Sequence, residues 1–169
     1  HGCSRRQRQM CIRDRSSSVK LDKSVIQPYQ KSLVRIHELI ETDKIAAAKS
    51  EWAHLLRRVD KADKTQLAAY AASKHWHNLT VVASIEAKMW DNIPLRFPVA
   101  HRWWFDFYAK KHNIDPITMM SLARQESALD SEARSPVGAR GLMQIMPATA
   151  KYTAKKYKLK YQGAQDLYK

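Results

Sequence analysis

The sequence predicts an all-α fold, and three observations lead to that prediction. The chain has 169 residues and four glycines, with none between Gly2 and Gly138. Because the tight turns of a β-rich domain depend on glycine, its absence favours helices joined by short polar connections. Apolar residues recur at helical spacing from Leu33 onward. Hydrophobic residues make up 44% of the chain, which is enough to build a core.

Apolar stripes at helical spacing predict the first helices in order along the chain. The first stripe runs from Leu33 to Ile40 and the second from Ile45 to Val59. The next helices are expected to begin at polar capping residues, which are Thr42 or Asp43 for the second, Asp63 for the third and Asn78 for the fourth.

The remaining helices follow a break at Pro94 and Pro98. A fifth helix is expected around Trp103, Trp104 and Phe107. Tryptophans could stack on sugars, but at helical spacing they are more often core residues, and this interpretation is preferred for Trp52, Trp76, Trp90, Trp103 and Trp104. Asp115 followed by Pro116 predicts the cap and first residue of a sixth helix, running to about Ser127. After a loop, Pro147 predicts a seventh helix, running to about Tyr157, and the last residues are expected to form a loop.

The chain carries a formal charge of +14, which favours an anionic partner such as nucleic acid, an anionic membrane or cell wall. No helix-turn-helix, zinc-finger or RNA-binding motif is present, so nucleic acid is not expected. No apolar run is long enough for a transmembrane segment. Both cysteines, Cys3 and Cys11, lie near the start, and the histidines lack ligand spacing, so neither a metal nor a cofactor is expected.

The residues that carry chemistry lie between Leu122 and Ala150. Glu126 is expected near the C-terminal end of an apolar helix, just before a loop. Partial desolvation and the helix dipole would both favour the protonated carboxyl that a general acid needs. Taken alone, Glu126 would be interpreted as a solvated glutamate at a helix end.

Three linked blocks resemble the catalytic core of the lytic transglycosylases: Glu126-Ser127, Ser135-Pro136-Val137-Gly138-Ala139, and Gly141-Leu142-Met143-Gln144-Ile145-Met146-Pro147. The similarity is to the large soluble periplasmic members, whose catalytic domain is goose-lysozyme-like. Upstream, Ser50–Ala53, Gln66–Ala68 and Lys88–Pro98 resemble the helical linker region of the same proteins. The resemblance covers roughly residues 28–169.

The resemblance implies a site and a reaction. In the family, one glutamate cleaves the β-1,4 bond between N-acetylmuramic acid and N-acetylglucosamine, and the C6 hydroxyl closes on C1 to leave a 1,6-anhydro end. Glu126 matches that glutamate. The other matching residues are expected to bind saccharide (Ser135, Gln144, Met146) or to build the motif's backbone (Ser127, Gly138, Gly141).

The resemblance also implies an organisation and a location. We expect a disordered tail over residues 1–23, a helical linker region over 24–100, and the N-terminal part of a lysozyme-like domain over 101–169. Residues 1–15 look like translated linker or adapter sequence, the alternative being a basic arm. The implied partner is peptidoglycan and the implied location is the periplasm.

One departure and two alternatives accompany the resemblance. The family's later Ala-Tyr-Asn-Ala-Gly motif does not occur before Lys169, so we expect an incomplete site and an inactive isolated chain, with Glu126 open to water. Asp130 and Glu132 allow a two-carboxylate, muramidase-type hydrolase, although a charged turn is the preferred interpretation. A helical glycan- or protein-binding module without activity is the second alternative.

Overall fold

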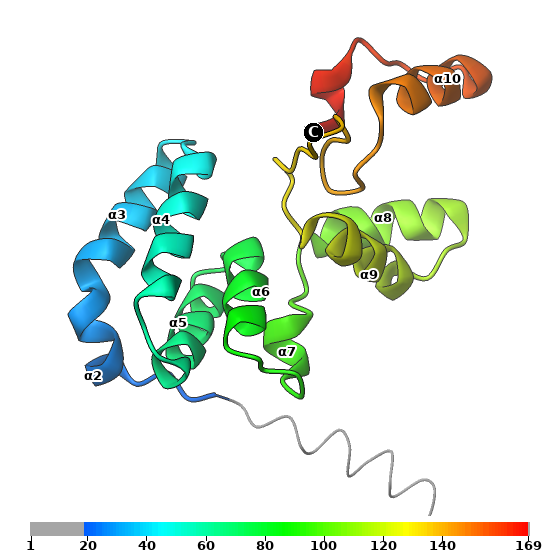
Figure 1. Cartoon of the computed structure of the whole chain (residues 1–169). Coiled ribbons are helices and arrows are strands. Elements are labelled where there is room, and N and C mark those ends of the chain that lie inside the picture. Colours follow the sequence, from blue (N-terminus) through cyan, green and yellow to red (C-terminus); the bar gives the residue numbers. More distant parts are fainter. Residues whose placement is uncertain (1–18, 169) are drawn as a thin grey trace, which may run out of the picture. The chain divides into compact units, whose positions relative to one another are not determined.

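The computed structural model describes residues 19–168, and all regular elements in that range are helices (Figure 1). The elements are α2 (Lys23–Ile26), η1 (Gln27–Tyr29), α3 (Gln30–Glu41), α4 (Ile45–Arg57), α5 (Lys61–Ser73), α6 (His77–Glu86), α7 (Ile93–Arg96), α8 (Arg102–His112), α9 (Pro116–Ser127), α10 (Pro147–Tyr157) and η2 (Ala164–Tyr168). The all-α prediction is therefore confirmed. The expectation for residues 1–15 lies outside the described residues.

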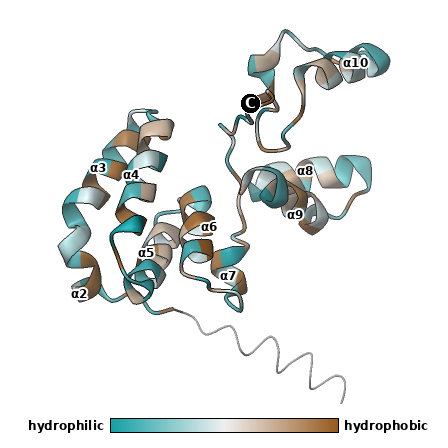
Figure 2. Ribbon diagram, viewed as in Figure 1, coloured by the Kyte–Doolittle hydropathy of each residue, from teal (hydrophilic) through white to brown (hydrophobic). Residues whose placement is uncertain are grey.

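The chain divides into two compact units, one reaching Pro98 and one beginning at Val99. In the first unit, α3 packs against α4 and α5 packs against α6. Their apolar stripes meet in one core, visible as brown segments on these helices in Figure 2. The core includes the stripe residues Leu33, Ile36 and Leu55, which are almost fully buried. The hydrophobic pattern of the sequence thus predicted the core correctly.

Two tryptophans tie the helix pairs of the first unit together. Trp52 of α4 is 1% exposed, and its indole N–H donates a hydrogen bond of 2.9 Å to the carbonyl of Leu79 in α6. The Trp76 ring lies edge-on to Trp52, with ring centroids 6.3 Å apart. A buried indole needs a partner for its N–H, and the α6 backbone supplies it. For these two residues the core interpretation of tryptophan is confirmed.

The predicted helix caps of the first unit are wrong at three helices. Helix α4 begins after Lys44, whereas Thr42 ends α3 by donating its hydroxyl to the Glu38 carbonyl. Helix α5 is capped by Asp60, whose carboxylate accepts the backbone N–H of Asp63, the predicted cap. Helix α6 begins one residue before the predicted Asn78, after Trp76. In each case another polar or aromatic residue stands nearby, and spacing alone does not choose between them.

Residues 19 to 22, which the sequence places in a disordered tail, are instead held against α5. The side-chain amide of Gln66 donates to the Lys20 carbonyl and accepts the backbone N–H of Asp22. Val19 packs against the core, and Asp22 caps α2 by accepting the backbone N–H of Ser24. A long-range amide contact therefore orders a segment whose own sequence is polar.

A partly buried hydrogen bond between Tyr29 and Asp63 makes the stability of the first unit depend on pH in the alkaline range. The Tyr29 hydroxyl donates to the Asp63 carboxylate, and this bond, with partial burial, raises the pKa of Tyr29 to about 12 from an ordinary 10.0. The folded state therefore holds the phenol proton more tightly than the unfolded chain. The associated stability is present below pH 10 and is lost as pH rises through about 12.

We therefore expect Tyr29→Phe to lose less stability than the wild type when pH is raised from about 10 to about 12. Urea unfolding at a series of pH values measures the difference. Tyr152→Phe, at an exposed position of α10, is the matched control and should follow the wild-type curve. Identical pH dependence in Tyr29→Phe and wild type would contradict a stabilising Tyr29–Asp63 bond.

In the second unit, α8 packs against α9, and the buried residues of these helices are Phe105 and Ala109 of α8 and Met120 and Ala123 of α9. The aromatic residues Trp103 and Trp104 do not join this core, since they are 64% and 55% exposed. Their expected core placement is therefore wrong. Trp90, near the end of the first unit, is also exposed.

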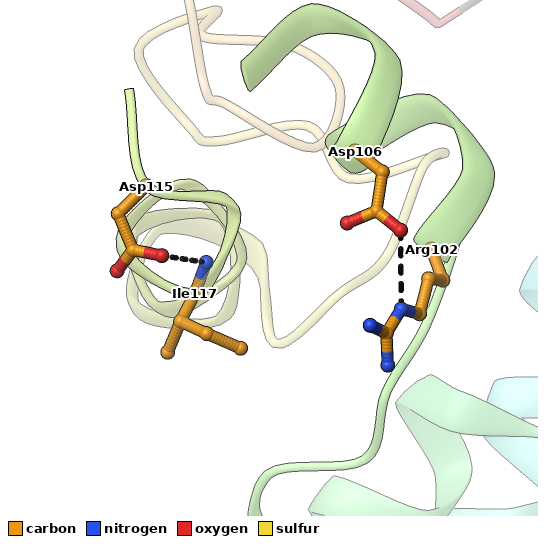
Figure 3. Close-up of polar contacts among 4 residues, drawn as sticks. All are labelled: Arg102, Asp106, Asp115 and Ile117. Carbon is orange, nitrogen blue, oxygen red and sulfur yellow. Dashed lines mark hydrogen bonds and ion pairs between the residues drawn. The ribbon is translucent and has the colours of Figure 1, made fainter. Parts of the chain in front are cut away.

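Figure 3 shows two polar contacts of acidic residues, one within α8 and one at the start of α9. Arg102 and Asp106 form an ion pair of 3.1 Å one turn apart on α8. The Asp115 carboxylate accepts the backbone N–H groups of Ile117 and Thr118, both at 3.2 Å. Pro116 is the first residue of α9. The Asp115-Pro116 prediction is confirmed, and this cap fixes the start of the helix that carries Glu126.

Candidate active site

Glu126 lies in the last turn of α9, as expected. Its side chain is exposed, which agrees with the expected openness to water and contradicts the partial desolvation expected at this helix end. The helix ends at Ser127, one residue later, because Ala128 and Leu129 both adopt left-handed backbone angles, with φ of 52° and 63°. Left-handed conformations are unfavourable for residues with a Cβ. Burial of Leu129, 4% exposed, holds the chain in this turn. The result is a carboxylate presented at the end of a well-anchored helix.

Asp130 does not share a helix face with Glu126, because α9 ends at Ser127. Instead the Asp130 carboxylate accepts the backbone N–H of Glu132 at 3.0 Å, and the Asp130 N–H donates to the Ser127 carbonyl. These bonds form a local turn of the kind that aspartate favours. The geometry supports the charged-turn interpretation of Asp130 and Glu132 over a second catalytic carboxylate on the same helix.

Ser127 has a structural contact. Its hydroxyl donates to the carbonyl of Ala123, one turn earlier in α9, at 3.0 Å. Such a bond gives a helix carbonyl a second partner, and it directs the serine hydroxyl back along the helix. This placement agrees with the expectation that Ser127 builds the motif and does not perform its chemistry.

Ser135 closes a short loop with Ala139. The Ser135 hydroxyl accepts the Ala139 N–H at 2.9 Å, and the Ser135 N–H donates to the Ala139 carbonyl at 2.9 Å. Gly138, at φ 98°, supplies the positive angle that lets the chain reverse between them. A serine hydroxyl that accepts one bond keeps its own O–H as a donor. The Ser135 side chain is thus fixed by the Ala139 backbone and keeps its O–H as a donor.

The Gln144 side chain stabilises the turn in which it lies, a role that the amino-acid sequence alone does not predict. The backbone N–H and carbonyl groups of Arg140 and Ile145 pair reciprocally at 3.1 Å, which closes a turn over residues 141–144. The Gln144 side-chain nitrogen donates to the carbonyls of Gly141 and Ala133, at 3.0 and 3.2 Å. Both N–H groups are therefore used internally, and the amide oxygen is the atom that can accept from a ligand.

Gly141 is required at its position for two reasons. Its φ is 75°, and a Cβ built there would lie 1.8 Å from the backbone carbonyl oxygen of Leu167 in η2. Its N–H donates to the Ala133 carbonyl at 2.9 Å. The sequence predicted a close backbone turn at Gly141, but the partner from η2, twenty-six residues later, could not be found from local patterns.

Met146 links this turn to α10. It is the N-cap residue of that helix, its side chain is 39% exposed, and Pro147 follows as the first helical residue. The predicted helix from Pro147 to Tyr157 is confirmed without shift. Glu126, Ser135, Gln144 and Met146 all belong to the second unit, on three consecutive structural pieces: the end of α9, the Ser135–Ala139 loop and the turn before α10.

No helix within residues 19–168 combines the length and the apolar character needed to cross a membrane. Comparison with known proteins matches both units. The family model described as soluble lytic murein transglycosylase L domain matches residues 27–93, and the transglycosylase SLT domain matches residues 104–169. The second match contains every residue of the candidate site.

Individual proteins give the same result. The soluble lytic murein transglycosylase of Salmonella typhimurium is 42% identical over 136 residues, which are 80% of this chain and 21% of that protein. The crystal structure of the 70-kDa soluble lytic transglycosylase from Escherichia coli matches with a TM-score of 0.83 and 37% identity, over 90% of this chain and 25% of that one. A complex of the 70-kDa soluble lytic transglycosylase with bulgecin A matches with a TM-score of 0.82 and 38% identity, over 89% of this chain and 24% of that one.

The chain thus spans between a fifth and a quarter of the length of these relatives. The structural likeness also confirms the predicted fold class, a helical array followed by a lysozyme-like part. Two family models match consecutive parts of the chain, and the relatives are about 40% identical to it and share its fold. The chain belongs to the soluble lytic murein transglycosylase family.

Proposed function

We propose that this chain supplies the catalytic carboxyl of a peptidoglycan lytic transglycosylase, and that Glu126 is that carboxyl. The observation that carries the proposal is the presentation of Glu126, exposed in the last turn of a helix that Asp115 caps, inside the region that matches the transglycosylase domain. The relatives are named for cleaving murein, which is peptidoglycan. The periplasm, where Gram-negative bacteria keep this polymer, is the proposed location.

In the proposed reaction, one carboxyl acts twice on the bond between N-acetylmuramic acid and N-acetylglucosamine. Protonated Glu126 gives its proton to the glycosidic oxygen as the bond to C1 of the muramic acid breaks. The C6 hydroxyl of the same sugar then forms a bond to C1, and Glu126 takes back the hydroxyl proton. The products are a free N-acetylglucosamine hydroxyl and a 1,6-anhydro end, with no water consumed.

The surroundings of Glu126 support a mechanism with one carboxyl. A retaining or inverting glycosidase needs a second carboxylate as nucleophile or base. The nearest candidate in sequence, Asp130, is engaged with the Glu132 backbone in a turn beyond the helix. We assign saccharide contacts to the Ser135 hydroxyl, the Gln144 amide oxygen and the exposed Met146 side chain.

The test is a digestion of purified peptidoglycan by the full-length gene product that carries this chain, followed by mass spectrometry of the released fragments. The proposal predicts fragments ending in 1,6-anhydro-muramic acid. Fragments ending in reducing muramic acid, heavier by one water, would establish the muramidase alternative. Binding without any release would favour the alternative of a glycan-binding module.

A further inference from the structure

A strongly basic surface lies on α10, directly after the candidate saccharide-binding residues. Between Glu132 and Asp166 the sequence has seven basic residues and no acidic one. Five of the seven are exposed lysines on α10 or just beyond it: Lys151, Lys155, Lys156, Lys158 and Lys160. Among them, Lys151 and Lys155 are four residues apart and therefore lie on the same side of α10, and Lys158 follows as the C-cap residue of that helix, with a left-handed backbone. We call these three residues the lysine face.

The stability of α10 alone does not account for the lysine face. Cations in the last turn interact favourably with the helix dipole, and this covers Lys155 and its neighbour Lys156. Lys151, however, lies in the first half of the helix, where the helix dipole does not stabilise a cation. Like charges three and four residues apart repel one another and destabilise the helix. The described residues place no carboxylate in an ion pair with the lysine face.

The position of α10 indicates which anion fits. Met146, a proposed saccharide contact, is its N-cap, so the lysine face begins one helical turn beyond the proposed site. At a rise of about 1.5 Å per residue, Lys151 lies roughly 6 Å along the axis from Pro147, and Lys155 roughly 12 Å. Peptidoglycan carries carboxylates on the peptides attached to its muramic acids. A glycan strand held at Met146 would bring such carboxylates alongside the helix.

We propose that the lysine face of α10 is a docking surface for the peptide carboxylates of peptidoglycan, outside the position where the glycan bond is cleaved. This inference rests on the proposed function, because it takes the same polymer as partner. The exposed ring of Tyr152, 67% exposed beside Lys151, offers an apolar surface to the same peptides. The surface would hold the polymer between cleavage events by many weak ionic contacts.

The test is cosedimentation of the 169-residue chain with purified peptidoglycan sacculi, comparing wild type with K151Q/K155Q/K158Q. Glutamine keeps the helix propensity of lysine and a flexible polar side chain, and it removes the charge. We expect roughly fivefold to tenfold weaker binding for the triple variant at low salt, from three exposed charge pairs. The difference should vanish at about 1 M salt, where the Debye length is about 3 Å.

The matched control is K31Q/K44Q/K61Q, which removes the same charge from exposed positions of the first unit. This control variant should bind sacculi like wild type. On sacculi whose carboxylates have been amidated, wild type should bind no more strongly than K151Q/K155Q/K158Q. Equal weakening in both triple variants, or undiminished binding to amidated sacculi, would overturn the proposal. The proposal would also be overturned if K151Q/K155Q/K158Q bound anionic vesicles or duplex DNA more weakly than wild type does but bound sacculi equally well. Because the assay measures binding alone, its failure would leave the product chemistry of the proposed function unaffected.

Discussion

Glu126→Gln is expected to abolish peptidoglycan cleavage by the full-length gene product, with a fall in rate of at least about a thousandfold. A positioned acid or base contributes roughly 10²–10⁴-fold, and here one group is proposed to serve as both. Glutamine has the same shape and cannot exchange a proton. Because Glu126 is exposed, its replacement should leave the fold unchanged. The measurement is the initial rate of fragment release from purified peptidoglycan, with circular dichroism to verify folding.

The two neighbouring carboxylates provide the control for Glu126. Asp130→Asn keeps the oxygen that accepts the Glu132 N–H, and Glu132→Gln keeps the side-chain length. Both variants should retain most of the wild-type rate if Glu126 acts alone. A loss in Asp130→Asn comparable to that in Glu126→Gln would instead support a two-carboxylate hydrolase.

Gly141→Ala should produce the largest structural effect of any single methyl group added to the second unit. The new Cβ would lie 1.8 Å from the Leu167 carbonyl oxygen, and the residue would be strained at φ 75°. Either the turn over residues 141–144 or η2 must then move. We expect a loss of about 3 kcal/mol or more, since overpacking and left-handed strain add together. Hydrogen exchange of the Gly141 amide, bonded to the Ala133 carbonyl, reports the opening.

Gly138→Ala separates strain from steric overlap. Gly138 also has a positive φ, 98°, but a Cβ there would meet no atom within 4 Å. Its replacement should therefore cost only backbone strain, on the order of 1–3 kcal/mol, and should leave the contact with η2 in place. If both variants increased hydrogen exchange at Gly141 equally, the close approach of Leu167 would not be the cause.

Helices and their apolar faces could be predicted where the information is local. The start of α9 follows from Asp115 and Pro116, and α10 follows from Pro147, because a capping side chain or a fixed φ acts within a few residues. The caps of α4, α5 and α6 failed because several polar residues stand near each start, and packing between helices selects one. The position of Glu126 was predictable for the same local reason as α9 itself.

Some features of the site could not be predicted from the sequence because they depend on contacts with residues far away along the chain. The amide of Gln144 reaches back eleven residues to the Ala133 carbonyl, and Gly141 meets Leu167 in η2. Trp103 and Trp104 have helical spacing, yet only one side of α8 packs on α9, so their rings are exposed. A helical pattern identifies an apolar face without identifying what covers it.

The central claim is that Glu126 directs an intramolecular attack in which water takes no part. Digestion of peptidoglycan by the full-length gene product in water enriched with heavy oxygen tests this directly. The account predicts muramic acid ends in anhydro form, free of heavy oxygen by mass spectrometry, with their formation lost in Glu126→Gln. Muramic acid ends that carry one heavy oxygen at C1 would show that water is the nucleophile and would contradict the account.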